Sequence, residues 1–280
     1  MRELSVDNIT QAVKEMCIEA NHELAKDMKE AFSLGKAKEE SPLGKQIFEQ
    51  LEENLKIAHE DMIPICQDTG MAVVFVKVGQ EVHLTGGSLK DAINEGVRRG
   101  YVDGYLRKSV VSDPIERINT KDNTPAIIHT EIVEGDKVEI TVAPKGFGSE
   151  NMSRVFMLKP ADGIEGVKNA ILTAVKDAGP NACPPMVIGV GVGGTFEKCA
   201  LMAKEALTRE AGSHSEIEWV KNLEEEMLET INKSGIGPGG LGGTVTALAV
   251  NVLTYPTHIA GLPVGINICC HVNRHAHREL

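Results

Sequence analysis

Four of the six cysteines in this 280-residue sequence stand where an expected strand meets a loop. Cys66 lies in IPICQDTG, just before the apolar run MAVVFVKV, and Cys183 lies in NACPP. The adjacent pair Cys269 and Cys270 lies in NICCHVN. Such junctions often carry functional groups on a rigid scaffold. An amide, a carboxylate and a hydroxyl follow Cys66 directly, so this turn offers a soft ligand beside groups that can bind and protonate a substrate.

The spacing of these cysteines favours an iron–sulfur cluster over a zinc site. Zinc is typically held by close CxxC pairs, and the sequence contains none. Cysteines far apart in the chain suit a cluster bound by several segments. Three thiolates on a four-iron cluster leave one iron without a protein ligand, and such an iron polarises a bound hydroxyl or carboxylate. Cys17 and Cys199 lie in helical patterns and are predicted to be small buried hydrophobic residues.

The elements that must position these cysteines indicate a mixed α/β (α+β) fold. We expect a helical N-terminal part packed on a sheet-centred part, with glycine-rich loops around a cluster site. Residues 1–280 are predicted to form a single domain, with a helical subdomain over 1–62 and a cluster-binding part over 63–280. Apolar periodicity predicts helices and strands over the ranges 5–32, 42–55, 71–78, 88–99, 163–178, 195–209, 215–233, 244–254 and 263–268.

Two local patterns carry further expectations. PAIIHTEIV and KVEITVA, separated by EGD, predict a hairpin around Gly135. The ten residues SGIGPGGLGG contain six glycines and predict a loop.

Composition narrows the range of partners. The chain is 42% hydrophobic and 25% charged, as in ordinary globular proteins, and its net charge is −11. This charge argues against nucleic acid and anionic membranes as partners, because both reward basic patches. No segment is long and apolar enough to cross a bilayer, and the N-terminus lacks the apolar run of a signal peptide. We therefore expect a cytoplasmic protein with reduced thiols.

The motifs ICQDTG, NACPP, GIGPGGLGG and HIAGLPVGINICC together resemble the iron–sulfur hydro-lyase family of class I fumarases and L-tartrate dehydratases. The resemblance covers essentially the whole chain and matches the α subunit, or the N-terminal domain of the fused form. It implies a [4Fe-4S] cluster held by Cys66, Cys183 and Cys270. Cys270 is chosen over Cys269 because its spacing from His258 keeps that of the family.

The same resemblance implies roles for polar residues around the cluster. Gln67 would bind a substrate carboxylate, and Asp68 would pair with His258 to handle a proton near the substrate hydroxyl. Arg107 would clamp a carboxylate through its planar guanidinium.

The loop KGFGSEN resembles a family glycine loop whose backbone approaches the substrate, with Gly146 and Gly148 as candidates. This chain has Phe147 where the family usually has a third glycine. Arg154 and Arg274 are further cations without an assigned role.

The implied activity is the reversible hydration of fumarate to L-malate by a class I fumarate hydratase α subunit, with L-tartrate dehydratase as the alternative. Further substrate-binding residues are expected from a separate β subunit, and the αβ unit is expected to form homo-oligomers. We therefore expect activity only with that subunit.

Two hypotheses of other classes stand beside this one. The stretch from Gly189 to Gly194 is a GxGxxG motif, the pattern of a nicotinamide-dependent dehydrogenase. Tight packing of a strand on the next helix also explains these glycines, and no second parallel strand is expected after that helix. The other hypothesis is a non-catalytic metal-binding or interaction subunit.

Overall fold

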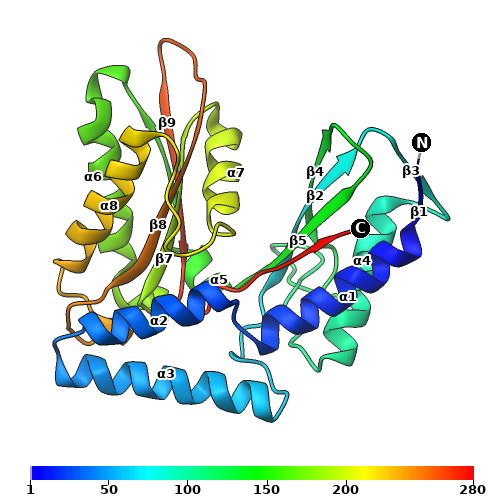
Figure 1. Cartoon of the computed structure of the whole chain (residues 1–280), viewed down its shortest axis with the longest axis horizontal. Helices are drawn as coiled ribbons and strands as arrows, with labels where there is room; N and C mark the ends of the chain where they lie inside the picture. Colours follow the sequence, from blue (N-terminus) through cyan, green and yellow to red (C-terminus); the bar gives the residue numbers. More distant parts are fainter. Residues whose placement is uncertain (1) are drawn as a thin grey trace. The chain divides into compact units, whose positions relative to one another are not determined.

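The computed structural model describes residues 2–280, which fall into two compact units. The first unit contains residues 2–25, Asn54–Phe147 and Arg274–Leu280, and the second contains Lys26–Glu53 and Gly148–Asn273. Each unit has its own sheet (Figure 1). Each also has its own buried apolar core. The predicted mixed α/β class is confirmed. The single domain with a boundary at residue 62 stays a prediction, although the helices of the first sixty residues are shared between both units.

The first unit is built on a four-stranded sheet flanked by two helices. Its elements are β1 (Arg2–Ser5), α1 (Val6–His22), β2 (Met71–Gly79), β3 (Val82–Thr85), α4 (Leu89–Asp103), β4 (Ile127–Val133), β5 (Val138–Lys145) and β10 (Ala276–Glu279). The sheet has the order β10-β5-β2-β4, and β1 pairs separately with β3. Helix α4 packs closely on α1. A Cβ added to Gly96 of α4 would lie only 2.7 Å from the Thr10 carbonyl oxygen of α1, so glycine is needed at this contact.

The predicted hairpin around Gly135 is wrong, because β2 lies between its two strands. β2 pairs in parallel with β4 and antiparallel with β5. Its sequence is an almost continuous apolar run that buries Ala72, Val74 and Val76 in the core, while Phe75 is partly exposed and Lys77 is exposed on the other face. The turn after β4 wraps around the end of β2, where Gly79 donates an N–H bond to the Lys137 carbonyl (2.8 Å).

The long first helix predicted from the N-terminal periodicity is broken. Helix α1 ends at His22, and α2 (Lys26–Lys38) begins after three residues. The carbonyl of Asn21 accepts the N–H of Ile65 (2.9 Å) in place of an N–H four residues along the helix. A contact between distant parts of the chain therefore ends a helix that local periodicity would continue.

The second unit carries a sheet with helices on both faces. Its elements, some shared with the first unit at their ends, are α2, α3 (Pro42–Glu60), α5 (Phe147–Glu150), β6 (Arg154–Leu158), α6 (Gly163–Ala178), β7 (Met186–Gly193), α7 (Phe196–Ala206), α8 (Glu218–Asn232), β8 (Ala247–Tyr255) and β9 (Leu262–Cys269). The strand order is β6-β9-β7-β8. Figure 1 shows α6 and α8 on one face of this sheet and α7 on the other. Within residues 2–280, no helix combines the length and apolar character needed to cross a membrane.

The GxGxxG motif serves packing in this unit. Gly189 and Gly191 lie inside β7, where added Cβ atoms would come within 2.1 Å of the Ala203 carbonyl and 2.2 Å of the Cys199 carbonyl. Both carbonyls belong to α7, so glycine is needed for the helix to approach the strand. This confirms the packing explanation for these glycines. As expected, α7 is followed by the acidic helix α8 and not directly by a strand. The parallel partner of β7, β8, comes only after α8 and ends at Tyr255, which is not an acidic residue.

Candidate active site

The six cysteines separate into an accessible group and a buried group. Cys183 is exposed, and Cys66 and Cys270 are partly exposed, whereas Cys17, Cys199 and Cys269 are buried. All six are thiols outside any disulfide. The accessible three are those that the family resemblance assigns to the cluster. Accessible thiols are also the ones that an incoming metal can reach, and they bind it as thiolates.

Asp68 joins two loops of the first unit. One carboxylate oxygen accepts the backbone N–H of Gly70 (3.0 Å), and the other accepts that of Phe147 (2.8 Å). A Cβ added to Gly146 would lie 3.2 Å from this second oxygen, so Gly146 lets the KGFGSEN loop pass close to the carboxylate. Gly148 has open space around its Cβ position. That either glycine contacts a substrate stays a prediction.

The turn from Cys66 to Gly70 rests on a buried polar support. The Tyr101 hydroxyl donates to the Thr69 carbonyl (2.7 Å), and the Asn123 amide donates to the Gly70 carbonyl (3.1 Å). Both side chains are fully buried. Burial raises the pKa of Tyr101 well above its ordinary value, so its hydroxyl stays a donor at every physiological pH.

Thr69 brings the segment of Arg107 to this turn. Its hydroxyl donates to the Arg107 carbonyl (3.1 Å), and the Arg107 side chain is exposed. Gln67 is exposed as well, and its side-chain oxygen lies 3.4 Å from the Cys66 sulfur. The first unit therefore places Cys66, Gln67, Asp68, Gly146 and the backbone of Arg107 around one turn. Their roles toward a substrate stay predictions.

Arg274 holds the Asp68 turn through its guanidinium. It is 4% exposed, and it donates to the carbonyls of Asp68 and Pro144. Its third guanidinium nitrogen, Nη1, is buried without a hydrogen-bond partner among the described residues. Sequence reasoning left this cation without a role. The structure shows that it joins the turn after Cys66 to the end of β5. Arg154, in the second unit, donates to its neighbours Asn151 and Ser153.

We expect Arg274→Met to loosen this turn. The variant leaves a buried and a partly buried carbonyl without a charged donor, and hydrogen bonds to charged groups are worth about 1.5–3 kcal/mol each. A loss of about 3 kcal/mol in the free energy of urea unfolding is therefore expected. Arg278→Met is the matched control, since Arg278 forms an exposed pair with Glu19 that is worth at most about 1 kcal/mol. Equal losses in the two variants would contradict this role for Arg274.

Cys183 and the segment after Cys270 lie side by side in the second unit. The Cys183 carbonyl accepts bonds from both the backbone N–H (3.3 Å) and Nδ1 (3.0 Å) of His271. Cys183 has left-handed backbone angles (φ 52°, ψ 63°), which are uncommon for a residue with a Cβ. This conformation is held by its own N–H, which donates to the Pro180 carbonyl (3.0 Å). Two of the three predicted cluster ligands thus come from adjoining segments.

The alternation of β9 separates Cys269 from Cys270. Cys269 is the last residue of β9 and pairs with Val187 of β7. It is 3% exposed, while Cys270 follows the strand and is partly exposed. Successive side chains in extended backbone point to opposite sides. The choice of Cys270 as the ligand therefore agrees with its accessibility.

His258 lies in the exposed turn between β8 and β9. Its Nδ1 accepts the backbone N–H of Ala260 (3.2 Å), so in the neutral ring the proton is carried by Nε2. This arrangement leaves Nε2 as the atom that can exchange a proton with a substrate or a carboxylate. The pairing of His258 with Asp68 stays a prediction, because the two residues belong to different units.

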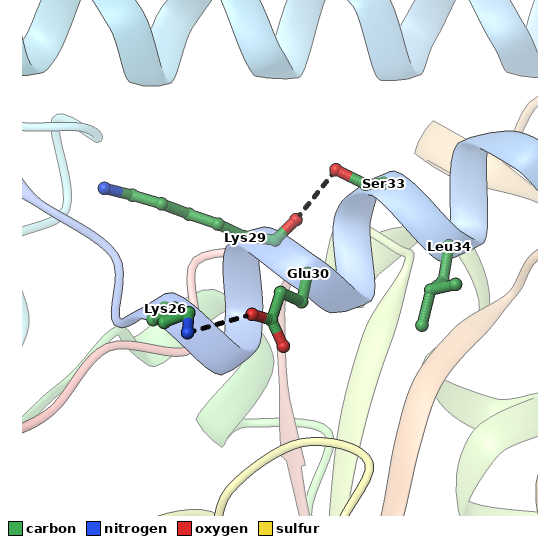
Figure 2. A pocket seen from close by; sticks show the side chains of 5 residues that line it. All are labelled: Lys26, Lys29, Glu30, Ser33 and Leu34. Atoms are coloured by element: carbon green, nitrogen blue, oxygen red, sulfur yellow. Dashed lines mark hydrogen bonds and ion pairs between the residues drawn. The ribbon is translucent and has the colours of Figure 1, made fainter.

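Cys66 belongs to the first unit and Cys183 and Cys270 belong to the second, so the convergence of the three cluster ligands stays a prediction. Within residues 2–280, no group of three or more His, Cys, Asp or Glu side chains is gathered closely enough to hold a metal ion. Figure 2 shows a hollow beside α2 that is lined by Lys26, Lys29, Glu30, Ser33 and Leu34. Its charged groups pair locally, with Lys26 3.6 Å from Glu30. This hollow contains none of the predicted site residues.

The accessibility of the thiols leads to a direct prediction for the metal-free chain. At pH 8, iodoacetamide should label Cys66, Cys183 and Cys270 while Cys17 stays unmodified. Burial raises the pKa of Cys17 from 9.0 to about 12, which lowers its thiolate fraction about a thousandfold. Peptide mass spectrometry of native protein checks this pattern, and labelling in urea should remove the difference. Early modification of Cys17 in the native chain would contradict the buried placement.

Comparison with known proteins adds independent information. The profile of the family described as fumarate hydratase (Fumerase) matches residues 10–279. A Methanocaldococcus jannaschii protein named "Putative L(+)-tartrate dehydratase subunit alpha" is 41% identical, over 97% of each chain. The L(+)-tartrate dehydratase subunit alpha proteins of Escherichia coli K12 and Shigella sonnei are each 29% identical, over 98% of this chain and 91% of theirs.

Proposed function

The chain belongs to the fumarate hydratase (Fumerase) family, and from this premise we propose that it is the α subunit of a class I fumarate hydratase. The proposed reaction is the reversible addition of water to fumarate, giving L-malate. One observation carries the proposal beyond the family match: the three cysteines that the resemblance assigns to a cluster are the accessible ones, and the other three are buried.

The residues proposed to hold a [4Fe-4S] cluster are Cys66, Cys183 and Cys270. Their chemistry fits this group, because such clusters are bound by cysteine thiolates. The adjoining positions of the Cys183 and His271 segments support the assignment of Cys183 and Cys270. When bound, a cluster with three protein ligands supplies a Lewis-acidic iron that polarises a hydroxyl or carboxylate group. Reduced thiols suit the predicted cytoplasmic location.

The remaining site residues are proposed to bind the diacid and move one proton. Arg107 and Gln67 are exposed beside the Asp68 turn and would orient the two carboxylates. Asp68 and His258 would handle the proton at the departing oxygen, with His258 Nε2 as the exchanging atom. Gly146 and Gly148 would let the loop backbone approach the substrate. Removal of the proton at carbon is assigned to the partner subunit.

L-Tartrate is the second candidate substrate. The named relatives that cover almost the whole chain are tartrate dehydratase α subunits, and this favours a substrate with a second hydroxyl. Malate and tartrate share the carboxylates and the hydroxyl that leaves, so the residues described above suit both. Discrimination would depend on groups that meet the additional hydroxyl.

The relatives' subunit names also support a separate β subunit. The test is to reconstitute the chain anaerobically with iron and sulfide, add the β subunit, and measure dehydration of L-malate and L-tartrate. We expect turnover only with both subunits and with the cluster present. Preferential turnover of malate supports a fumarate hydratase, and preferential turnover of tartrate replaces it by the second candidate. Full activity of the chain by itself would overturn the requirement for a partner.

A further inference from the structure

Glu39 is a buried carboxylate that the proposed chemistry does not use. It follows α2 and is 1% exposed. Its two oxygens accept backbone N–H bonds from Ser41 (2.8 Å), Thr244 (2.9 and 3.0 Å) and Val245 (2.8 Å). A buried charge is costly unless hydrogen bonds compensate for it. This carboxylate therefore binds the backbone of the segment that begins at Thr244.

That segment directly follows the glycine-rich loop 235–243. The last residue of this loop lies against the carboxylate. A Cβ added to Gly243 would lie 2.8 Å from one Glu39 oxygen, and Gly243 has a φ of 134°. A Cβ added to Gly44 would lie 2.6 Å from the Glu39 carboxyl carbon. A side chain at either position would have to displace the carboxylate, so the two glycines let the backbone lie close against it.

The other side of the same loop supports the turn that carries Cys183. Gly239 donates its N–H to the Pro184 carbonyl (2.8 Å). A Cβ added to Gly240 would lie 2.3 Å from the Pro180 Cβ, so the loop backbone rests directly on this proline. Pro180 and Pro184 flank Cys183, whose left-handed conformation needs support from its surroundings.

We propose that Glu39 is a positioning residue for Cys183, holding the glycine-rich loop against the Pro180–Pro184 turn. The charge strengthens three backbone bonds at one end of the loop, and the rigid loop transmits this constraint to the turn at its other end. The contacts stand independently of any activity. Their importance for a bound cluster rests on the proposed function.

The hydrogen bonds to Glu39 favour its charged form. Burial by itself would raise the pKa of Glu39, but the backbone N–H bonds from Thr244, Val245, Ser41 and Glu40 outweigh burial and lower it. The charged form is the one that the loop binds, so replacing it by a neutral amide removes the constraint without changing the size of the side chain.

The test compares Glu39→Gln with the control Glu40→Gln in the metal-free full chain. Glu40 is the exposed neighbour, so its variant removes a charge without touching the loop. Amide hydrogen exchange is measured at Gly239 and Cys183, whose N–H groups report the loop and the turn. We expect both amides to exchange at least about tenfold faster in Glu39→Gln and to be unchanged in the control. The amides of β2 in the first unit should not change.

A second measurement joins the inference to metal retention. After reconstitution with iron and sulfide, a chelator should remove iron from Glu39→Gln at least about tenfold faster than from the wild-type chain or the control. Faster exchange confined to Ser41, Thr244 and Val245, or spread evenly over the chain, would overturn the inference. A wild-type chain that never holds iron would refute the proposed function, while the exchange result would still decide the role of Glu39.

Discussion

Cys270→Ser is expected to abolish iron retention while the chain stays folded. Cys270 follows β9 and is partly exposed, so the substitution should change the free energy of unfolding by less than about 1 kcal/mol. A serine hydroxyl is a poor substitute for a thiolate as a cluster ligand. Loss of the iron would remove several kcal/mol of transition-state stabilisation, so turnover with the β subunit should fall by at least about a thousandfold. Iron and sulfide analysis after anaerobic reconstitution measures the first effect.

Cys269→Ser is the matched control for this prediction. Cys269 is 3% exposed and pairs with Val187 inside the sheet. Placing a hydroxyl there should cost about 1–3 kcal/mol of stability, since the polar group is buried. Its iron content should equal that of the wild-type chain. The opposite pattern, with iron lost in Cys269→Ser and kept in Cys270→Ser, would move the ligand to the neighbouring residue.

The residues next to each cysteine were sufficient to predict whether Cys17, Cys66, Cys183 and Cys199 are buried or accessible, because the apolar or polar character of neighbouring residues largely sets a side chain's exposure. Cys17 and Cys199 stand on apolar helical faces, and both are buried. Cys66 and Cys183 stand beside loop residues, and both are accessible. These properties depend on a few adjacent residues, which a sequence displays directly. Cys270 was instead chosen over Cys269 from the family spacing to His258, and the accessibility of the two residues agrees with that choice.

Strand pairing was less predictable, because it depends on residues far apart in the chain. The sequence from Ile127 to Lys145 has the local signals of a hairpin, yet β2 pairs with both of its strands. Nothing in the hairpin sequence shows that a more apolar strand occupies the position between them. The end of α1 at His22 is also associated with a contact to a distant residue, since the Ile65 N–H donates to the Asn21 carbonyl.

The supporting residues of the site were also missed for this reason. Arg274, Tyr101 and Glu39 act on backbone groups that are distant in sequence. Arg274 follows Cys270 by four residues, and this closeness to a predicted ligand was the available signal. Tyr101 stands on the buried face of α4, and its hydroxyl required a partner that only the fold identifies. Charged or polar residues near predicted ligand motifs therefore merit attention as supports as well as direct contacts.

Asp68→Asn should separate the chemical role of this residue from its structural role. The amide keeps one oxygen that can accept an N–H bond from Gly70 or Phe147, so the free energy of unfolding should change by about 1 kcal/mol. It cannot take up a proton or hold an imidazolium. Turnover by the reconstituted enzyme should therefore fall by about 10²–10⁴-fold, the range typical of a lost acid–base group. The KM for the diacid should change much less.

Asp68→Ala and Asp122→Asn complete this comparison. The alanine variant leaves both backbone N–H groups without their acceptor and should lose a further 1–3 kcal/mol, estimated roughly for two partly buried donors. Asp122 is another carboxylate of the first unit, and it accepts bonds from the Thr124 backbone N–H and the Arg98 side chain. Asp122→Asn should reduce stability while keeping turnover within about threefold of the wild type. If Asp68→Asn kept wild-type turnover, Asp68 would serve only to join its two loops, and the proton at the departing oxygen would need another carrier. His258 Nε2 is the atom we assign to that task in this case, because its Nδ1 already accepts the Ala260 N–H and Nε2 carries the exchangeable proton.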